Sequence, residues 1–187
     1  FQMGGLYGSH GMDGWHGTPQ FPAGTDGGSG WHGSAVGAIT VRLTREGDNL
    51  LVTAQSENKV IKVEFPLNMF PLQPDQHIYI QARGGQGGYG GNGGRGYTGC
   101  AVYDNRTGRC SRWIAGSDGR GGNGGDGGRG GQVTVHVDSW GKEFLPFIYI
   151  NVDGGLAGEG GWGQPSGWRG FPGSEGSIVT ISPEDRI

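Results

Sequence analysis

Seven short stretches of the chain alternate apolar and polar residues, which is the pattern of a half-buried β-strand. In the first of them, Ile39, Val41 and Leu43 alternate with polar neighbours, and Glu46-Gly47-Asp48-Asn49 follows as a turn. The other predicted strands cover 50–55, 60–65, 78–82, 133–137, 148–152 and 178–181. This pattern predicts a mainly β fold with almost no α-helix, built as an antiparallel β-sandwich or a partial barrel.

A second pattern, with glycine at every third position, covers about half of the chain. Its six runs are Gly5–Gly17, Gly24–Gly33, Gly84–Gly99, Gly116–Gly131, Gly155–Gly161 and Gly167–Gly176. A period of three is typical of the polyproline II type of helix, which has no internal hydrogen bonds. Every backbone N–H and C=O of such a rod needs an outside partner. We therefore expect a bundle of six polyglycine II helices, with glycine wherever two rods touch.

The glycine runs come in pairs, and each pair is joined by a breaker segment: 18–22, 100–110 or 164–166. We expect one composite domain over 1–187, with a β core from 38–82, 132–152 and 177–182. The rod hairpins would be 4–37, 84–131 and 153–176. The runs 84–99 and 116–131 are mostly Gly-Gly-x, with one side chain per turn, so they belong in the middle of the bundle. The Gly-x-x runs belong outside.

These runs resemble those of known polyglycine II bundle proteins. Examples are the glycine-rich tip adhesins of T-even-like phage long tail fibres and the springtail antifreeze proteins. The likeness rests on the six Gly-x-x or Gly-Gly-x runs and is architectural; the β-strand half has no counterpart. It implies a rod bundle and suggests display or adhesion, because loops at the bundle tip bind receptors in the phage adhesins. The breaker segments would occupy that place here.

Cys100 and Cys110 are the only two cysteines, and they flank a short segment between two glycine runs. We predict a disulfide between them, with two free thiols as the alternative. A disulfide implies an oxidising compartment, so we expect a secreted, extracellular or cell-surface protein. The chain begins at Phe1 rather than Met, as a processed secretory protein or an engineered fragment would. Asn105-Arg106-Thr107 is a sequon, which makes Asn105 a candidate glycosylation site.

The net charge of −3 favours neither nucleic acid nor an anionic membrane as a partner. No apolar stretch approaches the roughly 20 residues needed to span a bilayer, so we expect no membrane insertion. Residues 81–131 carry seven Arg and three Asp, a local charge of +7 − 3 = +4, and include fragments of an RGG box. The strict triplet spacing favours an ordered rod over an RNA-binding segment.

Two motifs suggest metal binding. His10, Asp13 and His16 recur on one face of a rod, but successive positions would lie about 9 Å apart, whereas zinc ligands lie about 2 Å from the ion. They could hold a metal only with a second rod. The segment 121–126 matches the start of a calcium-binding nonapeptide but lacks the apolar residue that should follow. Hydrolase, P-loop, metalloprotease and dinucleotide motifs are absent from the sequence. We therefore expect no metal, no cofactor and no enzymatic activity.

Aromatic residues and histidines on the outer runs are the candidate interface or ligand contacts: Trp15, His16, Trp31, His32, Trp162 and Trp168. They could pack on the β-domain, cover the rods, contact a neighbouring subunit or form a platform for sugars. We expect a structural subunit of an extracellular filament, sheath or surface layer that associates with copies of itself. The alternative is an adhesin or carbohydrate-binding module for surface glycans or a receptor. An antifreeze protein is a third interpretation, which the bulky residues on the outer runs disfavour.

Overall fold

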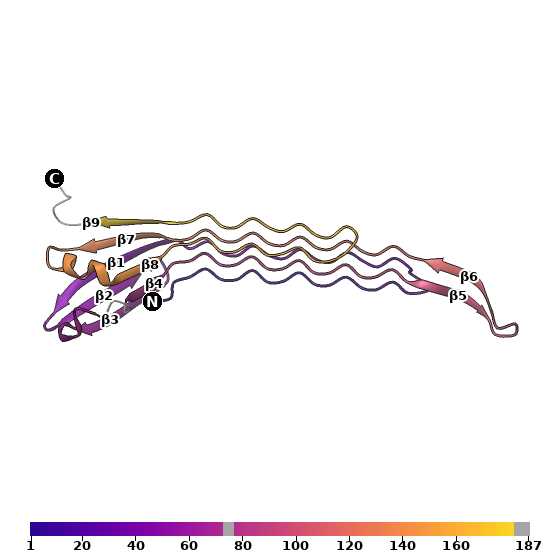
Figure 1. The fold of residues 1–187 in the computed structure, drawn as a ribbon, viewed down its shortest axis with the longest axis horizontal. Helices are drawn as coiled ribbons and strands as arrows, with labels where there is room; N and C mark the ends of the chain where they lie inside the picture. Colours follow the sequence, from indigo (N-terminus) through magenta and orange to yellow (C-terminus); the bar gives the residue numbers. More distant parts are fainter. Residues whose placement is uncertain (73–76, 182–187) are drawn as a thin grey trace.

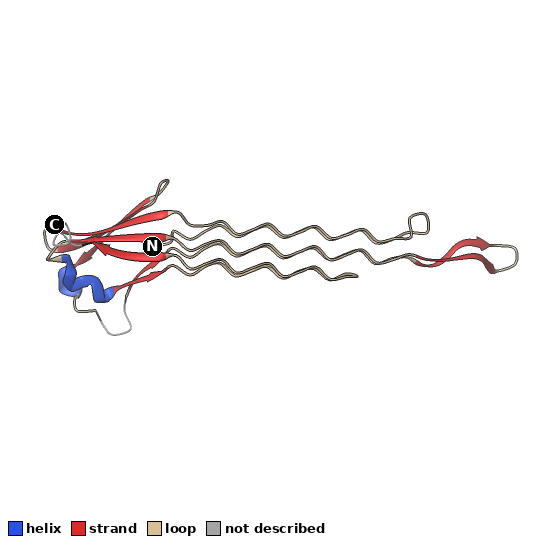
Figure 2. Cartoon of the chain, turned by 90° about the horizontal axis from the view of Figure 1, so that it is seen from above, coloured by secondary structure: helices blue, strands red, loops and turns tan. Residues whose placement is uncertain are grey.

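The computed structural model describes residues 1–72 and 77–181, so residues 73–76 and 182 of the predicted β core lie outside the described part. The molecule is elongated (Figure 1). Strands gather at one end, long undulating segments run side by side away from them, and a β-hairpin stands at the far end (Figure 2). The glycine runs therefore leave the β-domain in a single direction.

Nine strands occur in the described residues: β1 (Ala38–Glu46), β2 (Asn49–Gln55), β3 (Val60–Pro66), β4 (Ile78–Gln81), β5 (Thr98–Asp104), β6 (Arg109–Ala115), β7 (Gln132–Val137), β8 (Ile148–Asn151) and β9 (Ser177–Ile181). They form a five-stranded sheet of order β3-β2-β1-β7-β9 and two pairs, β4-β8 and β5-β6. The helices found in these residues are two short 3-10 helices, η1 (Leu67–Met69) and η2 (Gly141–Phe147). The prediction of a mainly β fold is confirmed.

All seven predicted strands are present, as β1 to β4 and β7 to β9. Burial alternates as predicted in β1, β4 and β7, whereas β2 buries three residues in succession and β3, β8 and β9 have no alternating buried face. In β1 the side chains of Ile39, Val41 and Leu43 are buried, while the residues between them are not. They share one hydrophobic core with β2, β4 and β7 and with Phe144 of η2. Burial of these apolar faces is the main stabilising contribution to the β-domain.

The prediction of an antiparallel arrangement was wrong for half of the strand pairs. The pairs β1-β2, β2-β3 and β5-β6 are antiparallel, but β1-β7, β7-β9 and β4-β8 are parallel. Parallel neighbours need long connections. Here the glycine-rich segments supply them, because each parallel strand begins or ends next to such a segment.

We number the glycine-rich segments rod 1 (4–17), rod 2 (24–37), rod 3 (84–97), rod 4 (116–131), rod 5 (154–163) and rod 6 (167–176). Backbone hydrogen bonds join rods 1, 3 and 5 into one row; for example, Gly11 N–H donates to Tyr89 O at 2.8 Å. Rods 2, 4 and 6 form a second row in the same way, as shown by the bond from Gly30 N–H to Asn123 O at 2.8 Å. Further bonds join the two rows, such as Gly122 N–H to Gly91 O at 2.8 Å.

Rods 3 and 4 each bond to four other rods, whereas rods 1 and 6 bond to two. This confirms that the Gly-Gly-x runs lie inside the array and the Gly-x-x runs outside. The inner positions require glycine because the neighbouring backbones leave no room for a Cβ. A Cβ added to Gly91 would overlap the carbonyl oxygen of Met12 on rod 1, and one added to Gly122 would overlap that of Gly28 on rod 2.

The two rows continue directly into the two sheets of the β-domain. Rods 2, 4 and 6 all run toward the β-domain and are followed by β1, β7 and β9, which are neighbours in the large sheet. Rods 3 and 5 run outward and follow β4 and β8, and Gln2 before rod 1 bridges to Gln81 of β4. Each rod hairpin gives one rod to each row, so all rods within a row have the same direction. This shared direction makes the adjoining strands parallel.

Candidate functional site

The side chains that the sequence offered as metal ligands accept backbone N–H groups from the neighbouring rod. The Nδ1 atoms of His10 and His16 accept the N–H groups of Tyr89 and Arg95, at 3.0 and 2.9 Å. Asp13 Oδ1 accepts the N–H of Asn92 at 2.6 Å. These N–H groups point out of the row, where no further rod is present to accept them. The three side chains therefore supply acceptors for N–H groups of rod 3 that no neighbouring backbone accepts.

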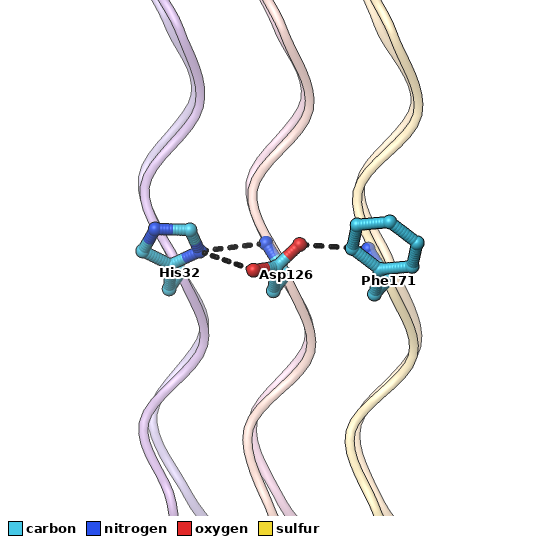
Figure 3. Close-up of polar contacts among 3 residues, drawn as sticks. All are labelled: His32, Asp126 and Phe171. Carbon is cyan, nitrogen blue, oxygen red and sulfur yellow. Dashed lines mark hydrogen bonds and ion pairs between the residues drawn. The ribbon is translucent and has the colours of Figure 1, made fainter.

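The opposite face of the array repeats this arrangement. Asp26 Oδ1 accepts the N–H of Arg120 at 2.7 Å. A series of side-chain to backbone hydrogen bonds links all three rods of this row (Figure 3). His32 Nδ1 accepts the N–H of Asp126 at 2.9 Å, and Asp126 Oδ1 accepts the N–H of Phe171 at 2.7 Å. The predicted contact residues His16 and His32 thus lie on opposite faces and serve the backbone.

Large apolar side chains line the edge formed by rods 1 and 2. We call this set the apolar edge stripe: Leu6, Met12, Trp15 and Trp31, each 70–83% exposed. Thr25 Oγ1 and Ser34 Oγ of rod 2 accept the N–H groups of Trp15 and Leu6, at 2.7 Å each, which ties these positions of the two rods together. The high exposure of Trp15 and Trp31 contradicts the interpretation in which these rings pack on the β-domain.

The edge formed by rods 5 and 6 carries a different set of side chains. Rod 6 places Arg169, Pro172 and Glu175 between its glycines, and Arg169 Nε forms an ion pair with Glu159 Oε1 of rod 5 at 3.1 Å. A further rod could dock only against glycine, because a Cβ holds two backbones apart. Side chains thus cover both edges of the array.

Rods 5 and 6 stop short of the others, and a cleft lies on each face near their ends. The first cleft has a volume of about 450 Å³ and is lined by Asp13, His16, Asn92, Arg95, Asp118, Trp162 and Gln164, with three glycines. The second has a volume of about 260 Å³ and is lined by Asp26, Ser29, Arg120, Asn123, Pro165, Ser166 and Trp168, with three glycines. The predicted contact residues Trp162 and Trp168 therefore lie in separate clefts on opposite faces.

The breaker segment with the two cysteines is the β5-β6 hairpin, which the sequence did not predict as strands. The predicted disulfide between Cys100 and Cys110 is confirmed, with a Cα–Cα distance of 5.7 Å. Its hairpin exposes Tyr103 and Trp113, at 60% and 67%. The sequence signal was weak because arginine and glycine interrupt the apolar alternation, and the strands pair with two register shifts.

The carboxylate of Asp104 organises the turn at the distal tip. The Thr107 hydroxyl donates to Asp104 Oδ2 at 2.7 Å, and the N–H groups of Arg106 and Thr107 donate to Oδ1 at 2.9 and 3.3 Å. These bonds, that of the Thr107 hydroxyl most of all, lower the pKa of Asp104 below its ordinary value of 3.8. The candidate glycosylation residue Asn105 lies exposed in this turn.

Comparison with family models, with curated proteins and with solved structures finds no match. No helix in residues 1–72 and 77–181 is long and apolar enough to cross a membrane. In the same residues, no three His, Cys, Asp or Glu side chains are grouped so that they could hold a metal ion.

Proposed function

We propose that the six rods are polyglycine II helices and that together they form a bundle. Three observations support this. Glycines that donate a backbone N–H recur every three residues along each rod, and their acceptors lie on neighbouring rods. Among the described residues, positive φ is confined to Gly47 and Gly108, both in turns, so the rod glycines keep the negative φ of this helix. Glycine at the contacts leaves no room for a Cβ.

We propose that the chain is a structural subunit of an extracellular assembly, in which the bundle is a stiff strut that associates with copies of itself. The observation that carries this proposal is the apolar edge stripe. Soluble monomers rarely expose several large apolar side chains in one row, and such rows mark contact surfaces. The disulfide in the distal hairpin supports an oxidising, extracellular location.

The contact between subunits would run through side chains rather than through a continued glycine lattice. Both edges carry side chains where a neighbouring rod would need glycine, so backbone-to-backbone growth is blocked. Two apolar edge stripes can instead face each other about a twofold axis, which buries Trp15 and Trp31 against the same residues of the second copy. Exposed strands such as β9, where Ile178 and Val179 are half-exposed, offer a second contact for a filament or sheet.

Analytical ultracentrifugation over a wide concentration range tests this proposal. We expect dimers or larger species for the natural chain and a shift toward monomer for the Trp15→Ala/Trp31→Ala double variant. Trp168→Ala is the matched control, because Trp168 is equally exposed but lies on a face of the bundle. A natural chain that stays monomeric at high concentration, with no filaments in negative-stain electron microscopy, would exclude the proposal.

A second candidate function is that of an adhesin or glycan-binding module. The observation that favours it is the projection of the β5-β6 hairpin beyond the rods (Figure 2). Tyr103 and Trp113 of this hairpin are exposed. An antifreeze role has less support, because a flat field of small side chains is interrupted by Tyr89 and Trp162 on one face and by Phe171 on the other.

A further inference from the structure

We propose that the clefts at Trp162 and Trp168 are two equivalent binding sites for a neutral saccharide, one on each face of the bundle. This inference concerns single chains and does not depend on self-association. It starts from the finding that the same four residue types, Trp, Asn, Arg and Asp, line both clefts.

The two clefts match in geometry as well as in composition. Asn92 Oδ1 accepts the backbone N–H of Trp162 at 2.9 Å, and Asn123 Oδ1 accepts that of Trp168 at the same distance. Arg95 follows Asn92 by three residues on rod 3, and Arg120 precedes Asn123 by three on rod 4. Because rods 3 and 4 run in opposite directions, each arginine lies on the distal side of its asparagine.

Backbone packing accounts for only part of this repeated set. The asparagine and aspartate oxygens accept N–H groups and are needed for the rods. The indole rings of Trp162 and Trp168 do not pack against the rods, since both residues are 81% exposed. Arg95 and Arg120 form no ion pair with another residue in the described part of the chain. Two exposed indoles and two arginines are therefore left beside fixed amides and carboxylates.

This combination suits a sugar ring. The flat C–H face of a saccharide can stack on an indole, while its hydroxyl groups both donate and accept hydrogen bonds. The amide nitrogens of Asn92 and Asn123 donate to no other described residue, and the guanidinium groups add donors. Asp13 and Asp26 each keep a second carboxylate oxygen as an acceptor.

The charges of the clefts favour a neutral ligand over an acidic one. Arg95 shares the first cleft with two carboxylates, Asp13 and Asp118, and Arg120 shares the second cleft with Asp26. Counting these groups gives +1 − 2 = −1 and +1 − 1 = 0, so neither cleft attracts a sulfated or uronic-acid sugar. Two sites on opposite faces would let one molecule bridge two glycan chains.

The test is a glycan array that carries neutral oligosaccharides of glucose, mannose, galactose and N-acetylglucosamine beside sulfated and uronic-acid glycans. We expect binding to neutral glycans only. Calorimetry with the best neutral oligosaccharide should then give two sites per chain with dissociation constants of roughly millimolar order, as expected for a shallow cleft. Trp162→Ala and Trp168→Ala should each remove one site, weakening it about tenfold or more.

Trp15→Ala is the matched control, because Trp15 is as exposed as the cleft tryptophans but lies outside both clefts. It should keep both sites, and it also separates sugar binding from self-association. Indole N–H signals in NMR spectra should shift for Trp162 and Trp168 alone when sugar is added. The inference is overturned if no neutral glycan binds, if only acidic glycans bind, or if the Trp162→Ala/Trp168→Ala double variant retains both sites.

Discussion

His32 and Asp126 lie on adjacent rods, and the imidazole Nδ1 accepts the backbone N–H of Asp126 at 2.9 Å while standing 3.4 Å from its carboxylate. The neutral ring must therefore carry its proton on Nε2. The same kind of contact recurs along both faces of the bundle. Side chains at the surface thus accept the N–H groups that a further row of rods would otherwise accept.

Replacing His32 by Ala should lower the free energy of unfolding by about 0.5–1 kcal/mol, because the N–H of Asp126 loses its acceptor at a partly solvated site. His32→Asn offers an amide oxygen in place of Nδ1 and should recover part of the loss. Ser29→Ala, on the same face of rod 2, is the control and should change nothing. Chemical denaturation measures all three; equal stability of His32→Ala and Ser29→Ala would contradict a capping role.

Gly91→Ala should destabilise the protein by about 3 kcal/mol, because the added Cβ overlaps the carbonyl oxygen of Met12. Gly37→Ala is the control, since a Cβ there meets no atom within 4 Å. Thermal unfolding followed by circular dichroism compares the two. If both variants melt together, the close contact of rods 1 and 3 does not exist in solution.

Reducing the disulfide should loosen the distal hairpin alone. Closure of a loop of this length is worth about 2–3 kcal/mol, and β5 and β6 pair only with each other. Trypsin should then cut at Arg106, Arg109 or Arg112, sites that resist cleavage in the oxidised protein. Hydrogen exchange of β1 and β7 should stay unchanged, and a faster exchange there would show that the hairpin supports the β-domain.

Lowering the pH should destabilise the turn that Asp104 organises. Its pKa is lowered in the folded protein, so its stabilisation of the turn is present above the ordinary pKa of 3.8 and is lost as the pH falls through the lower folded value. The N–H signals of Arg106 and Thr107 in NMR spectra should report this transition below about pH 4. Asp104→Asn should abolish it, and a persisting transition would assign it to another group.

The sequence predicted seven of the nine described strands and the rod positions, because each of these has a clear period. The alternation at Ile39, Val41 and Leu43 marks a half-buried strand in any sheet, and a Gly-Gly-x run has two bare sides wherever it lies. Strand direction carries no such local mark. It follows from how three rod hairpins sort into two rows, which depends on contacts between distant residues such as Gly91 and Gly122.

The sequence pointed to exposed side chains but not to their hydrogen-bond partners. Trp162 and Trp168 stood out as exposed aromatics, but their pairing with Asn92 and Asn123 requires the register between rods, which the sequence does not give. His10 and His16 resembled ligands because the triplet repeat places them on one face. Their acceptor role appears only once rod 3 is known to lie beside rod 1.

The register between rods gives the array a unit of length. Removing one residue from a rod turns every glycine beyond that point away from its neighbour, whereas removing three restores the contacts after a single step of about 9 Å. Insertions and deletions that persist in such a protein should therefore come in multiples of three, matched in adjoining rods. The length of the rods can therefore change in steps of three residues without any change to the β-domain or the distal hairpin.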